Sequence, residues 1–154
     1  MIPTKATSSE FATSLAATQA RATGRSLLIV DDEVTIRNAL RRFFVRRGWA
    51  VVDAADGEQA RALLLDGAHV GAGFDAIITD MRMPHLTGIA LHQCVHERCP
   101  AVAQRFIFSS GDTGDDASTG YIRGSDCAVL QKPFDLARLL ALVDAMPPVA
   151  GQPN

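Results

Sequence analysis

Short apolar runs recur along this chain, and between them the apolar residues are spaced as on one face of a helix. The runs predict strands at about 27–31, 50–53, 76–79, 106–109 and 128–131. Strands that alternate with helices form parallel sheets, because each helix carries the chain back to the starting edge. The pattern therefore predicts an α/β protein, a doubly wound three-layer sandwich made of repeated βα units.

The first predicted helix, at about 33–47, combines an apolar face with many arginines. We expect Val34, Leu40, Phe43 and Phe44 to face inward. The arginines are expected to face mostly outward, and they are Arg37, Arg41, Arg42, Arg46 and Arg47. This basic face is interpreted either as a solvated surface or as a docking surface for an acidic partner.

Local signals place the remaining helices. Residues 56–58 open the second helix, and Gly88 precedes a third that ends before Pro100. A weak fourth helix is expected near 117–124. Asp135 is expected to cap the fifth helix, because an aspartate side chain can accept hydrogen bonds from the free N–H groups of a first turn.

Reactive side chains follow four of the predicted strands. Asp31 and Asp32 close the first run, Asp80 the third, Ser110 the fourth and Lys132 the fifth. Doubly wound sheets bind ligands just outside the carboxyl ends of their strands. We therefore expect these five side chains to meet at one edge of the sheet.

Composition narrows the class of protein. The 154 residues suit one domain with short extensions, and no apolar run approaches the length of a membrane span. The net charge of −2 does not by itself indicate a nucleic-acid surface. Cys94, Cys99 and Cys127 lack the spacing of a metal knuckle, and the N-terminus has no secretory pattern. These features predict a reduced compartment, the cytoplasm.

The chain divides into three predicted parts. A domain is expected at 26–146, after an N-terminal extension or linker at 1–25 and before a disordered tail at 147–154. Within the extension, residues 8–22 are interpreted either as a disordered leader or as a short helix with Phe11 and Leu15 inward.

Three neighbouring carboxylates need a cation. Two unit charges 4 Å apart repel by about 4 kcal/mol at an effective dielectric constant of about 20. Oxygen ligands without His or Cys favour a hard ion, most commonly Mg²⁺. With Lys132 and the hydroxyl of Ser110 nearby, the Asp80 carboxylate could then act as a nucleophile that forms an aspartyl phosphate.

The order of these motifs resembles the CheY-like receiver domain of two-component response regulators, over about residues 26–146. The motifs are Asp31-Asp32, Asp80 with Met83-Pro84 and Gly88, Ser110-Gly111, and Lys132-Pro133-Phe134. The stretches 109–115 and 129–134 look most like receivers of hybrid histidine kinases. The resemblance implies a flavodoxin-like fold with a five-stranded parallel sheet of order 2-1-3-4-5.

The resemblance also implies a role for each matching residue. Asp80 would be the phosphoacceptor, Ser110 the switch hydroxyl and Lys132 the phosphate-binding lysine. Asp31, Asp32 and Asp80, with the backbone carbonyl of Arg82, would hold Mg²⁺. The Lys132-Pro133 peptide bond would be cis.

By the same resemblance the protein would be a stoichiometric phosphoacceptor rather than an enzyme. Its donor would be a sensor histidine kinase or a histidine phosphotransfer domain, and its downstream target would be a further protein. No nucleic-acid or membrane contact is implied, and a homodimer stays open. One departure concerns Val129, which stands where many receivers carry the Tyr or Phe of their switch. We expect no output domain within this sequence.

The residues present argue against three rival functions. A phosphohydrolase with an aspartate nucleophile would need a second acid two residues after Asp80, where Arg82 stands. A flavin mononucleotide binder would need a Ser/Thr-rich loop where Asp31, Asp32 and Glu33 would repel phosphate. A receiver-like scaffold that is never phosphorylated conflicts with the complete set of site residues.

Two histidines, His92 and His96, are one turn apart on the third predicted helix. They could form a zinc face. We favour the interpretation that both histidines are exposed and that Cys94 is buried.

Overall fold

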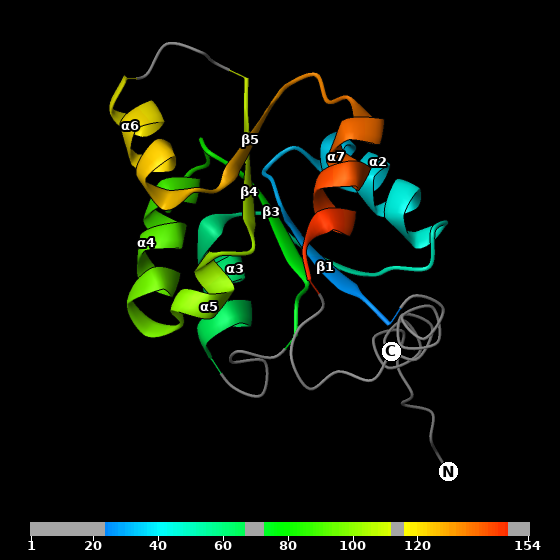
Figure 1. Ribbon diagram of the computed structural model, residues 1–154, viewed down its shortest axis with the longest axis horizontal. Coiled ribbons are helices and arrows are strands. Elements are labelled where there is room, and N and C mark those ends of the chain that lie inside the picture. Colours follow the sequence, from blue (N-terminus) through cyan, green and yellow to red (C-terminus); the bar gives the residue numbers. More distant parts are fainter. Residues whose placement is uncertain (1–23, 67–72, 112–115, 148–154) are drawn as a thin grey trace.

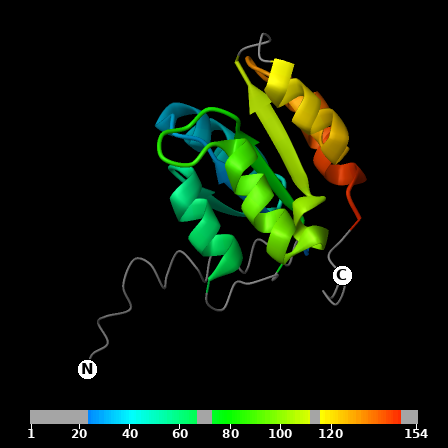
Figure 2. The ribbon, with the colours of Figure 1, turned by 90° about the vertical axis from the view of Figure 1, so that its left-hand side faces the viewer.

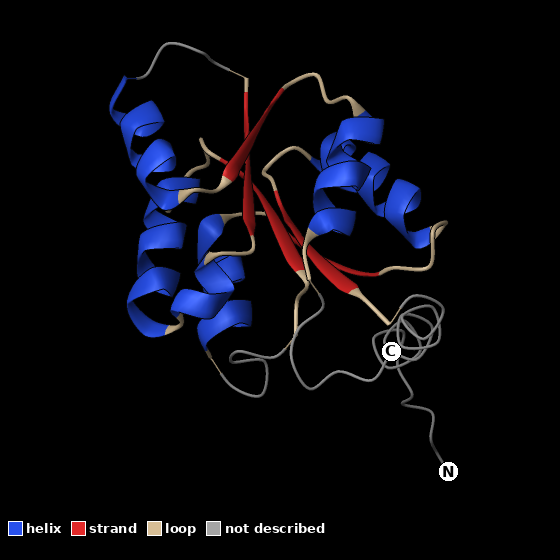
Figure 3. Ribbon diagram, viewed as in Figure 1, coloured by secondary structure: helices blue, strands red, loops and turns tan. Residues whose placement is uncertain are grey.

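The computed structural model describes residues 24–66, 73–111 and 116–147. These residues form a five-stranded parallel sheet between two layers of helices (Figure 1, Figure 3). The strands are β1 (Ser26–Val30), β2 (Ala50–Ala54), β3 (Ala76–Asp80), β4 (Phe106–Ser110) and β5 (Ala128–Gln131). Their order is β2-β1-β3-β4-β5, so the predicted fold class is confirmed.

Six helices accompany the sheet in the described residues. They are α2 (Val34–Val45), α3 (Gly57–Leu65), α4 (Gly88–Arg98), α5 (Pro100–Ala103), α6 (Asp116–Ser125) and α7 (Leu136–Ala145). Helices α2 and α7 cover one face of the sheet, and α3 to α6 lie on the other (Figure 1). Helices α3 and α4 pack side by side (Figure 2).

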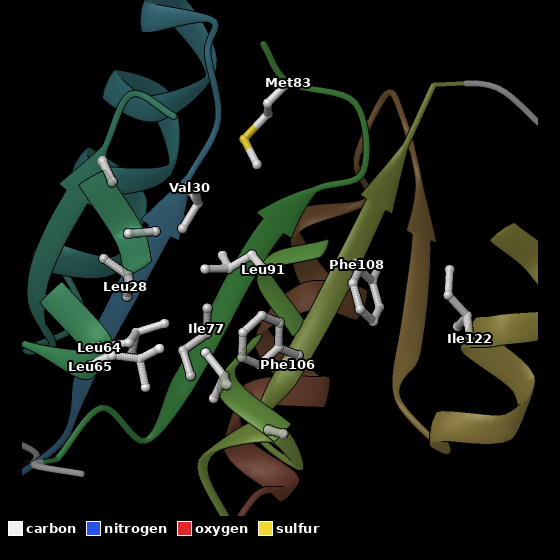
Figure 4. Packing of buried hydrophobic residues seen from close by; sticks show 14 residues of the cluster. Leu28, Val30, Leu64, Leu65, Ile77, Met83, Leu91, Phe106, Phe108 and Ile122 are labelled. Atoms are coloured by element: carbon white, nitrogen blue, oxygen red, sulfur yellow. The ribbon is translucent and has the colours of Figure 1, made fainter. Parts of the chain in front are cut away.

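The three central strands, β1, β3 and β4, each supply side chains to two hydrophobic cores. Leu28 and Val30 of β1 point into the core beneath α3 and α4, where Phe106 of β4 also lies (Figure 4). Leu27 and Ile29 point into the core beneath α2 and α7. Successive side chains of a strand face opposite sides, so a strand buried on both faces is apolar at every position. This explains the continuous apolar runs of the sequence.

Two details differ from the sequence-based expectation. A separate short helix, α5, follows α4, because Pro100 sits in its first turn, where its missing N–H costs no hydrogen bond. Val34, expected inside, is 56% exposed. At about 100° per residue, Val34 lies about 120° around the helix from Leu40 and about 80° from Phe44, the two buried residues of α2.

Other expectations are confirmed or lie outside the described residues. Asp135 caps α7 and accepts hydrogen bonds from the N–H groups of Ala137 and Arg138, at 3.0 and 3.3 Å. Residues 8–22, interpreted as a disordered leader or a short helix, and nearly all of the predicted tail at 147–154 lie outside the described ranges. No helix among the described residues is both long and apolar enough to cross a membrane.

Candidate functional site

The carboxyl edge of the sheet brings three carboxylates together. Asp31 follows β1 and is 2% exposed, and Asp80 ends β3 and is 7% exposed. Asp32 is exposed beside them. One carboxylate oxygen from each lies within 4.8 Å of the others. Across the described ranges, this is the one group of three or more His, Cys, Asp or Glu residues with a geometry suited to a metal ion.

The ammonium group of Lys132 faces these acids from the end of β5. Its Nζ lies 3.1 Å from Oδ2 of Asp31, 3.2 Å from Oδ2 of Asp80 and 3.4 Å from Oε1 of Glu33. The Lys132-Pro133 peptide bond is cis, as expected. The backbone N–H of Lys132 donates to the carbonyl of Ser110 at 2.8 Å, which joins the ends of β5 and β4.

The site has an excess of negative charge. Burial raises the pKa of Asp80 above its ordinary value, the charge of Asp31 adds to this, and Lys132 opposes it. Burial disfavours the charged form of Lys132, but hydrogen bonds and charge from Asp31 and Asp80 outweigh it and raise the pKa of Lys132. One ammonium does not neutralise these acids, so the edge attracts a further cation.

A cavity of about 200 Å³ opens beside Asp80. It is lined by Glu33, Asp80, Met81, Arg82, Ser110, Gly111 and Lys132. A Cβ atom added to Gly111 would meet nothing within 4 Å, so the space next to it is open to a ligand. The five residues predicted from strand ends are thus brought together, with four of them around one carboxylate.

The loop after β3 shapes the other side of the cavity. The backbone N–H of Arg82 approaches Oδ1 of Asp80 at 3.4 Å. The loop closes where the N–H of Gly88 donates to the carbonyl of Met81 at 3.1 Å. A Cβ atom on Gly88 would lie 2.3 Å from the carbonyl oxygen of Asp80, so only glycine fits there without displacing backbone. Sequence reasoning had matched Gly88 to a motif without assigning it this role.

The interpretation of the α4 histidines is wrong in part. His92 is buried, with 3% exposure, while Cys94 is only partly buried. Nε2 of His92 lies 3.1 Å from the carbonyl of Ala103, and Nδ1 lies 2.6 Å from the hydroxyl of Tyr121. A carbonyl only accepts, so Nε2 carries the proton and Nδ1 accepts from Tyr121. Both ring nitrogens have protein partners, which leaves no zinc face.

The arginine face of α2 is also less open than expected. Arg37 and Arg41 both form ion pairs with Asp53 on β2, and the side chain of Arg37 is only 15% exposed. Arg42, Arg46 and Arg47 are exposed or nearly so. The two arginines of the basic face that pack against β2 thus share one acid of the sheet, which offsets part of their positive charge.

The fold and the acidic edge define a class of signalling domain. The response regulator receiver domain model matches residues 27–144, so the chain belongs to this family. Receiver domains bind Mg²⁺ at an acidic pocket and interact with histidine kinases or phosphotransfer proteins. The family prediction from sequence is thereby confirmed.

Individual relatives agree with the family. The chain is 34% identical over 120 residues to the transcriptional activator protein PfeR of Pseudomonas aeruginosa, covering 78% of this chain and 37% of that protein. It is 29% identical to the sensor kinase CckA of Brucella abortus, covering 79% of this chain and 12% of the kinase. A response regulator receiver protein from Pseudomonas putida has a similar structure, with a TM-score of 0.67, 32% identity and coverage of 78% and 95%. The chain thus spans less than half the length of these two curated relatives.

Proposed function

We propose that this protein accepts a phosphoryl group on Asp80 and that the phosphorylated form changes its binding to a partner protein. The observation that supports the proposal most is the placement of the Asp80 carboxylate at the cavity, 3.2 Å from the ammonium of Lys132 and beside two further acids. The receiver unit is proposed to span 26–146, and we place it in the cytoplasm.

The donor set fits a hard divalent cation. Asp31, Asp32 and Asp80 offer carboxylate oxygens only, and the backbone carbonyl of Arg82 is proposed as a fourth ligand. A bound Mg²⁺ would supply positive charge for the oxygens of an incoming phosphoryl group.

The remaining chemistry falls to the chain itself. A carboxylate oxygen of Asp80 attacks the phosphorus of a phosphohistidine on the donor protein, and the P–N bond breaks with its electron pair on the leaving imidazole. Lys132 neutralises charge on the transferred group, and the hydroxyl of Ser110 donates to one of its oxygens. The donor is a histidine kinase or a histidine phosphotransfer domain.

Acetyl phosphate tests the proposal. Incubation with acetyl phosphate and Mg²⁺ should add the mass of one phosphoryl group to the intact protein. Asp80→Asn should abolish the gain, because an amide is not a nucleophile of this kind. The matched control is Asp144→Asn on the exposed side of α7, which should be phosphorylated like the wild type.

Two results would contradict the proposal. A mass gain that persists in Asp80→Asn would place the phosphoryl group elsewhere. No gain with acetyl phosphate or with any histidine kinase would favour the unphosphorylated scaffold.

A further inference from the structure

The guanidinium group of Arg37 lies outside the acidic cluster but binds the backbone that carries Asp31 and Asp32. Arg37, in the first turn of α2, donates from Nη1 to the backbone carbonyl of Asp31 at 2.8 Å. Its Nε donates to Oδ2 of Asp53 on β2 at 3.0 Å. The largely buried side chain of Arg37 thus ties the loop after β1 to the edge strand of the sheet.

The carbonyl in question belongs to the peptide group that joins Asp31 to Asp32. Other bonds fix Asp31 on its remaining sides: its N–H donates to the carbonyl of Ala54 at 3.2 Å, and its Oδ1 accepts from the N–H of Glu33 at 2.9 Å. The orientation of the joining peptide decides how the Asp32 carboxylate is presented. Arg37 donates a side-chain hydrogen bond to the carbonyl of that peptide.

We propose that Arg37 is a positioning residue of the cation site, which it serves by holding the Asp31–Asp32 peptide so that both carboxylates face one ion. The inference rests on the proposed function, specifically on a divalent ion held by Asp31, Asp32 and Asp80. Groups that orient metal ligands contribute about 10- to 100-fold to affinity. Arg37 acts through the backbone rather than on a carboxylate, so we expect an effect of about tenfold.

The chain offers a matched control in Arg41. Arg41 binds the same Asp53 carboxylate and donates to the carbonyl of Val51 at 3.2 Å, so these contacts are to β2 rather than to the Asp31 carbonyl. Removing either positive charge would by itself tighten the binding of Mg²⁺, because a cation near the site is lost. Loss of positioning acts in the opposite direction and only at Arg37.

Isothermal titration of the full chain with Mg²⁺, at constant ionic strength, separates these effects. Arg37→Gln should raise the Kd for Mg²⁺ about tenfold, whereas Arg41→Gln should leave it unchanged or lower it. Arg37→Lys keeps the charge but cannot span both acceptors, so it should also raise the Kd. If circular dichroism shows that Arg37→Gln does not fold, the Kd of Arg37→Lys is used as the test instead.

The outcomes distinguish the inference from the proposed function. Wild-type Kd values in the Arg37 variants would overturn the role of Arg37, and so would an equal loss in Arg41→Gln, which would indicate loosening of the whole contact between α2 and β2. A wild-type protein that binds no Mg²⁺ and gains no phosphoryl mass would instead remove the proposed function, and the role of Arg37 with it.

Discussion

Gly88 shows how a single missing atom shapes the site. A methyl group there would collide with the carbonyl of Asp80, which is backbone and cannot turn away as a flexible side chain would. The requirement comes from space rather than from φ, because Gly88 is not among the residues with positive φ. Substitution of Gly88 therefore tests how tightly the loop after β3 is held against the backbone of Asp80.

We expect Gly88→Ala to lower the free energy of unfolding by about 1–3 kcal/mol, the usual effect of an added group in a packed site. Gly120 in α6 is the matched control, since a Cβ there would meet nothing within 4 Å. Gly120→Ala should raise stability by roughly 0.5–1 kcal/mol through helix propensity. Urea unfolding of the two variants measures both values, and a Gly88→Ala protein as stable as the wild type would contradict the steric argument.

The sequence was sufficient to predict those site residues that are placed by the end of a strand. Asp31, Asp80 and Lys132 meet because parallel strands end at one edge, and that rule needs no side-chain detail. The bonds of Arg37 were not predictable in this way. They depend on how far a long side chain reaches across to another strand, and neither spacing nor periodicity carries that information.

At the scale of elements, the sequence predicted where the helices lie better than which of their residues are buried. Two histidines four residues apart on α4 were expected to share an exposed face. The buried stripe of α4 instead includes Leu91, His92 and Val95, while His96 is exposed. His92 belongs to this stripe because α6 brings the hydroxyl of Tyr121 to its ring, and a contact between two helices is invisible to the pattern of either one.

The His92 contact predicts a pH dependence of stability. Burial lowers the pKa of His92. The hydrogen bond to the carbonyl of Ala103 opposes this shift, and the charge of His96 adds to it. The unfolded chain then binds the proton more readily. Stability is full well above the unfolded pKa of about 6.5 and falls as the pH drops below it, by at most about 1.4 kcal/mol per pH unit.

Urea unfolding between pH 7.5 and about pH 5 measures this slope. Tyr121, Cys127 and His96 are the titratable groups around the ring. His92→Gln should flatten the dependence, because glutamine stays neutral, and the exposed His96→Gln should keep most of it. A slope that is unchanged in His92→Gln would assign the pH dependence to other groups.

At the scale of the whole molecule, the two edges of the sheet are closed in different ways. At the amino edge, neutral backbone acceptors bind two arginines: Arg25 donates to the carbonyl of Met146 at 2.6 Å, and Arg105 to those of Asp75 at 3.1 Å and Pro147 at 2.7 Å. The carboxyl edge instead gathers charges that repel one another. Repulsion among these charges is a cost in stability at the edge that is proposed to carry the function.

A cation should offset that cost. A ligand that binds only the folded state stabilises it by about 2.7 kcal/mol when its free concentration is about 100 times its Kd. At a free Mg²⁺ concentration of about 100 times the Kd, we expect the free energy of unfolding to exceed its value in chelator by about this amount. A measured stability that does not depend on Mg²⁺ would argue against a divalent site at this edge.

Asp80→Asn should separate repulsion from binding in the same experiment. Since the pKa of Asp80 is raised, the ionised carboxylate destabilises the fold at pH 7, and its neutral substitute should make the protein more stable than the wild type in chelator. The variant also lacks one of the three acids that would hold the ion, so Mg²⁺ should stabilise it less, and the advantage should shrink or reverse as Mg²⁺ is added. If the variant is less stable even in chelator, the contact between Asp80 and Lys132 outweighs burial and repulsion, and the acidic edge is balanced without a cation.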